Sequence, residues 1–171
     1  MDKLTIHFQY DKKEYINAFR NYLFKSKVIH KRDLIIVGIM AVLEFLLLIF
    51  AGVSVSSIIF GVILCFYLFI FVLLYFVQPS HVYKRSPQLH KPYTMTFTKD
   101  ELLFRTKGEA SSVHWNKYCE LWDCKDFYYL IQAKNIYTVI PKRALSNGNG
   151  LRDFDNILKA TGLPLIKYDK Q

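Results

Sequence analysis

The dominant feature of the hydrophobic pattern is a run of 44 residues, Leu34 to Val77, that contains one charged side chain, Glu44. A helix needs about 20 apolar residues to cross the hydrocarbon core of a membrane, and the run divides into two stretches of that length. We expect one span over residues 34–53 and a second over residues 57–77, joined by a turn at residues 54–56. The pattern therefore predicts a two-helix transmembrane hairpin.

The composition of both stretches favours insertion. Each central Leu, Ile, Phe or Val favours the membrane by about 0.3–0.6 kcal/mol, whereas a central acid costs about 3 kcal/mol. The second stretch contains 16 such apolar residues, which gives an insertion free energy of roughly −6 kcal/mol. The first contains 14, and after the penalty for Glu44 its insertion free energy is about −2 to −3 kcal/mol. Neither stretch shows the polar stripe of a soluble amphipathic helix.

Positive charge lies on both outer flanks of the hairpin, and the turn is uncharged. The flanking cations are Lys25, Lys27, Lys31 and Arg32 before it and Lys84, Arg85 and Lys91 after it. Lys and Arg near the ends of spans concentrate on the cytoplasmic side. We therefore expect a multi-pass membrane protein with both termini in the cytoplasm.

Residues 1–33 predict a short strand followed by an amphipathic helix. Leu4, Ile6 and Phe8 alternate with polar residues, as in a half-buried strand. Asp11 is a plausible N-cap, and apolar residues then recur at helical spacing through about Val28. This helix could lie on the lipid surface or pack on the soluble part of the chain.

The polar segment 78–91 is interpreted as a linker, and residues 92–171 follow with a β pattern. Six short alternating segments separated by turn residues predict six antiparallel strands, at 93–98, 101–106, 110–115, 117–123, 127–132 and 137–140. Apolar residues from Leu151 onward recur at helical spacing, and the helix should end at Gly162. The expected fold class is an α+β membrane protein. Beside its hairpin it should have a small antiparallel β-barrel or sheet, capped by a C-terminal helix in the manner of a pleckstrin-homology domain.

Short motifs in this region resemble the YcxB-like family of bacterial membrane proteins. They are the segments Tyr93-Thr94-Met95-Thr96-Phe97 and Asp100-Glu101-Leu102, then Trp115, and then Ile140-Pro141-Lys142-Arg143. The resemblance implies an N-terminal strand and helix, a two-span hairpin and a C-terminal domain, here residues 92–171, but no biochemical activity. This chain has Trp115-Asn116-Lys117-Tyr118 where the family often has Trp-x-Asp-Ile. The missing acid weakens any inference about a charge at that position.

The chain is basic, with a formal net charge of +9 and a pI of about 9.4. Basic segments beside a membrane are attracted to anionic lipid. No nucleic-acid recognition motif accompanies the charge, so we expect no nucleic-acid partner. Lys142 and Arg143 follow the last predicted strand. They could be solvated charges at a strand end, or they could contact anionic headgroups or an acidic partner.

Nothing in the sequence predicts catalysis, a cofactor or a metal site. Catalytic and nucleotide-binding motifs are absent. Cys119 and Cys124 lack the second ligand pair that a structural zinc site needs. Ser111, Ser112 and His114 are close in sequence, but neighbours on a strand point to alternating faces. Trp115 is expected in the core.

Glu44 is the strongest single candidate, because ionisable groups inside membranes usually face protein and mark functional sites. Pairing the spans about the predicted turn sets Glu44 opposite Phe66 and Tyr67, whose hydroxyl could bond the carboxyl group. The alternatives are a structural hydrogen bond in the hairpin or an oligomer, proton or ion handling, and a tolerated polar group. The small residues Ser57, Gly61 and Cys65 should form a packing face toward the first span.

These observations favour a non-enzymatic membrane protein that presents a small binding or regulatory domain to the cytoplasm. Its partner would be a protein, a lipid surface or a second copy of the chain. The alternative is an immunity protein that protects the membrane against a membrane-active bacteriocin.

Overall fold

The structure is a computed structural model that describes residues 3–146 and 148–168. The chain divides into a β unit, residues 1–11 and 86–171, and a helical unit, residues 12–85. The division differs from the expected boundaries, because the N-terminal strand belongs to the β unit and the N-terminal helix belongs with the hairpin.

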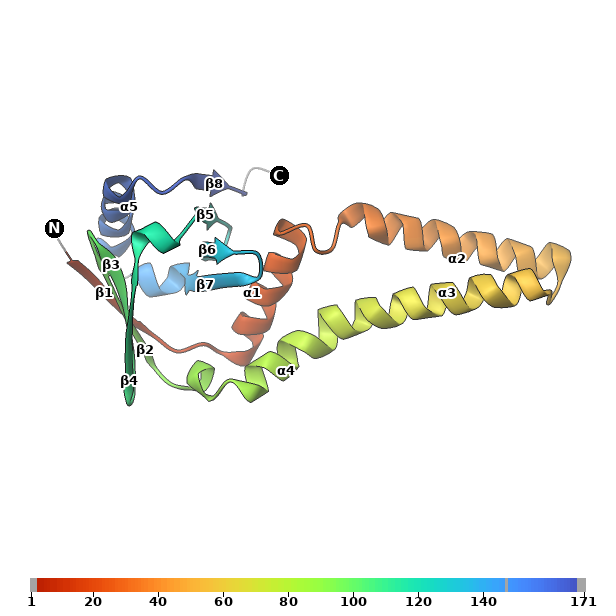
Figure 1. Ribbon diagram of the computed structural model, residues 1–171, viewed down its shortest axis with the longest axis horizontal. Helices are drawn as coiled ribbons and strands as arrows, with labels where there is room; N and C mark the ends of the chain where they lie inside the picture. The colour runs from red at the N-terminus through yellow and green to blue at the C-terminus, as the bar shows by residue number, and fades with distance from the viewer. Residues whose placement is uncertain (1–2, 147, 169–171) are drawn as a thin grey trace. The chain divides into compact units, whose positions relative to one another are not determined.

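The first sheet of the β unit is antiparallel and includes that N-terminal strand. Its order is β1-β2-β3-β4 (Figure 1), and the strands are β1 (Lys3–Phe8), β2 (Tyr93–Thr98), β3 (Glu101–Thr106) and β4 (Glu109–His114). The register of β1 on β2 runs from Lys3 opposite Thr98 to Phe8 opposite Tyr93. The alternation of apolar residues predicted β1 as a strand but did not identify its partner.

The second sheet has the order β7-β6-β5-β8. Its strands are β5 (Glu120–Asp123), β6 (Phe127–Ala133), β7 (Ile136–Pro141) and β8 (Leu165–Lys167). A short 3-10 turn, Trp115–Lys117, precedes β5, so the strand expected from residue 117 starts later. β8 pairs with β5 in parallel. The six predicted strands are present as β2 to β7 and pair antiparallel, but the prediction missed β8, whose pairing is parallel.

The core of the β unit is built around Phe154 on α5 (Gly150–Thr161), whose side chain is fully buried. Its ring centroid lies 5.1 Å from that of Phe97 on β2 and 5.1 Å from that of Tyr128 on β6. One helix residue therefore packs against both sheets. The helix ends at Gly162, which has the left-handed φ of 69° that favours glycine, as the sequence predicts.

The segment after β1 is held to the second sheet by hydrogen bonds. The Tyr10 hydroxyl donates to the backbone oxygen of Val139, and Arg143 Nη2 donates to the backbone oxygen of Gln9 at 2.7 Å. Residues 3–10 thus contribute a strand to the first sheet and hydrogen bonds to β7 and to the turn that follows it.

The helical unit consists of α1 (Lys12–Lys25), α2 (Lys31–Ala51), α3 (Val55–Val72), a π-helical turn (Leu73–Val77) and α4 (Gln78–Arg85). The last three run on without a break as an apolar helix from Val55 to Arg85. This helix and α2 are each long and apolar enough to cross a membrane. Residues 78–85, interpreted above as part of a linker, are therefore helical, and a short 3-10 helix at Pro87–His90 follows them.

Pro79 explains why the second long helix contains a π turn. Proline has no backbone N–H and clashes with the carbonyl four residues earlier, here that of Tyr75. The helical hydrogen bonds here reach one residue further back than in an α-helix, and the Gln78 N–H donates to the Leu73 oxygen, five residues earlier. A π-bulge of this kind lets the helix continue through the proline.

The hairpin turn lies slightly earlier than expected. α2 ends at Ala51, Gly52 has a φ of 65°, and Ser54 is the N-cap of α3. The Ser57 N–H donates to Ser54 Oγ at 3.3 Å, and the Ser54 N–H donates to Ser57 Oγ at 2.9 Å. This reciprocal capping box fixes the start of α3.

Candidate functional site

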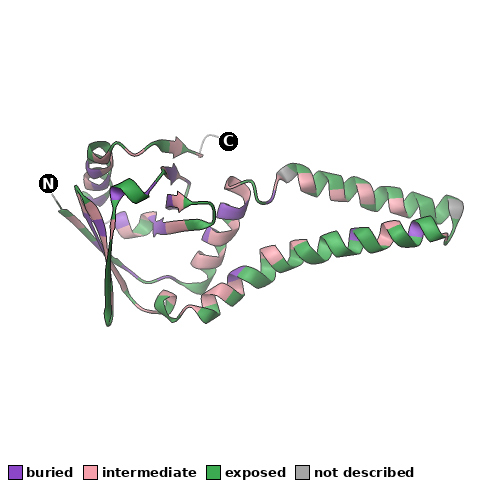
Figure 2. Ribbon diagram, in the orientation of Figure 1, coloured by how far each residue is buried: buried purple, intermediate pink, exposed green. Residues whose placement is uncertain are grey.

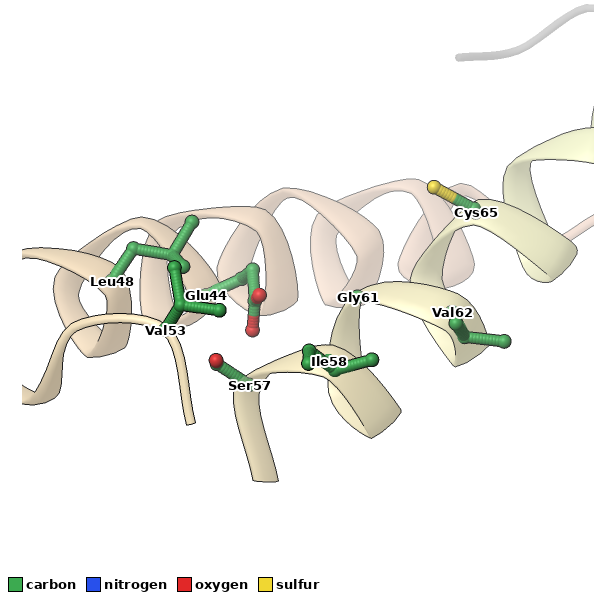
Figure 3. A pocket seen from close by; sticks show the side chains of 8 residues that line it. All are labelled: Glu44, Leu48, Val53, Ser57, Ile58, Gly61, Val62 and Cys65. Atoms are coloured by element: carbon green, nitrogen blue, oxygen red, sulfur yellow. The ribbon is translucent and has the colours of Figure 1, made fainter. Parts of the chain in front are cut away.

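Glu44 on α2 reaches across the hairpin to the backbone of α3 at Gly61 (Figure 3). A Cβ atom added at position 61 would lie 3.2 Å from Glu44 Oε1, so a side chain at this position would make the carboxyl group shift. Glu44 Oε2 is buried and has no hydrogen-bond partner in the part of the chain that the structure describes. The carboxyl group is thus partly buried against the backbone of α3.

The carboxyl group lies at a cavity of about 390 Å³ beside α2 and α3, which is widely open on its outer side. Apart from Glu44 the cavity is lined by apolar and small residues: Leu48, Val53, Ser57, Ile58, Gly61, Val62 and Cys65. Ser57 is buried, but its hydroxyl is engaged, since it donates to the Ser54 backbone oxygen at 2.9 Å. The predicted packing face, Ser57, Gly61 and Cys65, therefore lines the same cavity as Glu44.

The expected hydrogen bond between Glu44 and Tyr67 is not formed among the described residues. Tyr67 does not line the cavity, and its side chain is 44% exposed. The reason is the position of the turn. Centring the turn on residue 53 rather than residue 55 brings Gly61, not Phe66 or Tyr67, opposite Glu44.

Arg20 on α1 forms a second polar feature of the helical unit, which the sequence analysis missed. Arg20 Nε donates to the Tyr75 backbone oxygen at 3.2 Å, the carbonyl that Pro79 cannot bond. The guanidinium carbon also lies 4.5 Å from the centroid of the Tyr75 ring and 5.2 Å from that of Phe76. The sequence signal for this contact was Pro79 itself. A proline within a helix cannot donate to the carbonyl four residues earlier, here that of Tyr75, which can therefore accept a bond from a side chain.

Lys142 and Arg143 are engaged inside the β unit. Lys142 Nζ lies 2.7 Å from Asp123 Oδ1 on β5 and 4.8 Å from the centroid of the Tyr128 ring. Arg143 bonds the Gln9 carbonyl, as described above. These contacts favour the interpretation of the pair as structural charges at the end of β7 over a contact with headgroups.

The remaining candidates do not form a reactive cluster in the described ranges. Cys65 and Cys119 are exposed and Cys124 is buried, and none of the three forms a disulfide. No group of three His, Cys, Asp or Glu side chains that could hold a metal ion occurs among the described residues. Trp115 lies in the core, where its Nε1 donates to the Thr98 backbone oxygen at 2.8 Å.

Burial changes the pKa of two tyrosines in the β unit, Tyr129 and the half-buried Tyr93. Burial is the main cause that raises the pKa of Tyr129 and, to a smaller extent, the pKa of Tyr93 above the ordinary value of 10.0. Tyr129 is fully buried on β6. These hydroxyls therefore stay protonated at neutral pH and act as structural groups.

The excess positive charge is concentrated in the helical unit. Residues 12–85 carry nine Lys and Arg against three acids, whereas the β unit carries fourteen against eleven. Two thirds of the net charge thus lies in the unit that contains the apolar helices.

These features define a small α+β protein in which a two-sheet domain is joined to two long apolar helices. Residues 97–158, from β2 to α5, match the model of the YcxB-like protein family. The match confirms the resemblance over that segment, while β1, the helical unit and β8 lie outside it. Comparison with curated proteins and with solved structures gave no match.

Proposed function

We propose that the protein is a bacterial inner-membrane protein whose helical hairpin anchors a binding domain, the β unit, at the cytoplasmic face. The observation that carries this proposal is the exposure of large apolar side chains along both α2 and α3 (Figure 2). Phe50 is 84% exposed and Phe66 is 65% exposed. Contiguous apolar surface on this scale is rare on soluble monomers and is stable in lipid.

Charge and length support the orientation. The apolar part of the second helix, Val55 to Val77, is about 34 Å long at 1.5 Å per residue, which matches a hydrocarbon core of about 30 Å. Cations lie at the outer ends of both helices, and the turn carries none. In this proposal the β unit, which is connected at residues 11 and 86, lies on the cytoplasmic side, where the flanking cations would also meet anionic lipid.

The β unit acts by binding rather than by catalysis in this proposal. Two packed four-stranded sheets with one helix in the core support the pleckstrin-homology-like interpretation, a plan that commonly serves as a recognition platform. The engaged state of Lys142 and Arg143 and the modest net charge of the β unit favour a protein partner over a lipid headgroup for this domain.

Site-specific photocrosslinking in intact membranes tests the binding function. A photoreactive phenylalanine analogue is placed at exposed positions on three elements of the β unit: Ser112 on β4, Lys134 in the turn before β7 and Arg152 on α5. We expect a discrete protein adduct from one of these elements and none from Phe69, an exposed apolar position on α3. A scan of all three elements without a protein adduct would reject the proposal.

A further inference from the structure

We propose that the hairpin cavity at Glu44 is a binding site for a lipophilic organic cation, a molecule with an apolar body and a single positive charge. The inference concerns the helical unit and goes beyond the partner of the β unit. It rests on the membrane placement proposed above.

The first argument is the unsatisfied acid. Glu44 Oε2 is buried without a hydrogen-bond partner in the described part of the chain, and the whole run from Leu34 to Val77 contains no Lys, Arg or His that could neutralise it. Lipid acyl chains offer neither a donor nor a charge. An ionised carboxylate in hydrocarbon is costly unless it is paired, so the complementary occupant is a cation.

The second argument is the shape and lining of the cavity. Its volume of about 390 Å³ falls in the range of small-molecule sites, roughly 300–1,000 Å³. Leu48, Ile58 and Val62 supply apolar surface, and Gly61 leaves room for the carboxyl group. An apolar wall with one well-placed polar group is the usual composition of such a site.

The third argument is access. Val53, at the turn, forms one end of the cavity, and Glu44 lies seven residues before the end of α2, which is about 10 Å of helix. The cavity therefore begins near the turn, on the side of the membrane opposite the cationic flanks. A hydrophobic cation dissolved in the outer leaflet can reach it laterally.

The test uses the full chain reconstituted in zwitterionic lipid vesicles, with flotation as the first readout. Equilibrium dialysis then measures binding of tetraphenylphosphonium and of tetraphenylborate, an anion of nearly the same size and shape. We expect saturable binding of the cation alone, although the net charge of +9 disfavours any cation nonspecifically. Glu44→Gln should weaken that binding about tenfold or more, because it removes one charge of a desolvated pair.

Two variants distinguish binding in the cavity from the effect of the protein's net charge and from partitioning into the lipid. Asp155→Asn makes the same charge change at an exposed position on α5 and should leave binding unchanged. Gly61→Leu should abolish binding by filling the cavity, while the protein still floats with the vesicles.

Failure to float would reject the membrane placement itself. Equal binding of the two ions, or unchanged binding by Glu44→Gln in protein that floats, would overturn the site. A dimer that requires Glu44, with no saturable cation binding, would also overturn it and would assign the cavity to a second copy of the chain.

Discussion

Glu44 and Gly61 face each other across the hairpin, with 3.2 Å between Glu44 Oε1 and the position that a Cβ atom would take at residue 61. The pairing couples the charged residue of the apolar run to the glycine at which α2 and α3 approach closely. Small residues allow such approaches in lipid, where apolar burial itself gives no preference for protein over acyl chains.

Gly61→Leu should therefore loosen the hairpin. The added side chain meets the carboxyl group, and such overpacking typically costs about 1–3 kcal/mol. Gly38→Leu on α2 is the matched control, since a Cβ there has no neighbour within 4 Å. Denaturant titration of the full chain in mild detergent, followed by circular dichroism, measures both. Equal midpoints for the two variants would contradict the packing.

Arg20 should stabilise the π turn through the Tyr75 carbonyl that Pro79 leaves free. Arg20→Ala should lower the stability of the contact between α1 and the second long helix by about 1 kcal/mol, the combined scale of a hydrogen bond and an exposed cation–π contact. Hydrogen exchange of the α1 amides reports the loss.

Pro79→Ala provides the second arm of this test. It restores an N–H that can bond the Tyr75 carbonyl, so Arg20→Ala should cost less in that background. Additive effects of the two substitutions would show that the proline and the arginine are not coupled.

Lys142→Ala should destabilise the β unit by about 1 kcal/mol, because it breaks a partly exposed ion pair with Asp123 and a contact with the Tyr128 ring. Lys134→Ala, in the exposed turn before β7, should have no effect on stability. Chemical denaturation followed by tryptophan fluorescence measures the difference. We expect the salt dependence of vesicle binding to be the same in both variants; a selective loss in Lys142→Ala would restore the headgroup role.

The buried tyrosines predict the response to alkaline pH. Burial raises the pKa of Tyr129 above 10.0 in the folded protein, so above pH 10 the unfolded chain binds fewer protons than the folded one. Stability should be independent of this group below pH 10 and should fall as the pH rises further. Tyr129→Phe should flatten that fall in a pH titration of the unfolding midpoint. An unchanged slope would show that Tyr129 does not carry the effect.

Much of the fold was predictable because its signals are local. The strands Tyr93–Thr98 and Glu101–Thr106 and the helix ending at Gly162 have the predicted bounds, since alternation and a C-cap glycine act within a few residues. The pairing of β1 with β2 spans about 90 residues of sequence, and β8 is only three residues long. No local pattern encodes either of them.

The sequence predicted which residues form the candidate site, but it did not predict which residue lies opposite Glu44. Hydropathy singled out Glu44, and spacing singled out Ser57, Gly61 and Cys65. The residue opposite Glu44 depends on where the turn between the two helices is centred. Gly52 and the Ser54 capping box centre it two residues earlier than the sequence predicted. Residues 78–91 were interpreted as a linker, whereas a π turn lets the helix continue through Pro79 to Arg85.

The central claim is that the hairpin crosses the membrane with both of its ends in the cytoplasm, and thiol labelling tests it most directly. One variant keeps the exposed Cys119 of the β unit as its only cysteine, and a second carries only Ser56→Cys beside the turn. A membrane-impermeant maleimide should label residue 56 in intact cells and should label Cys119 only after the membrane is opened. Labelling of Cys119 in intact cells, with residue 56 protected, would contradict the account.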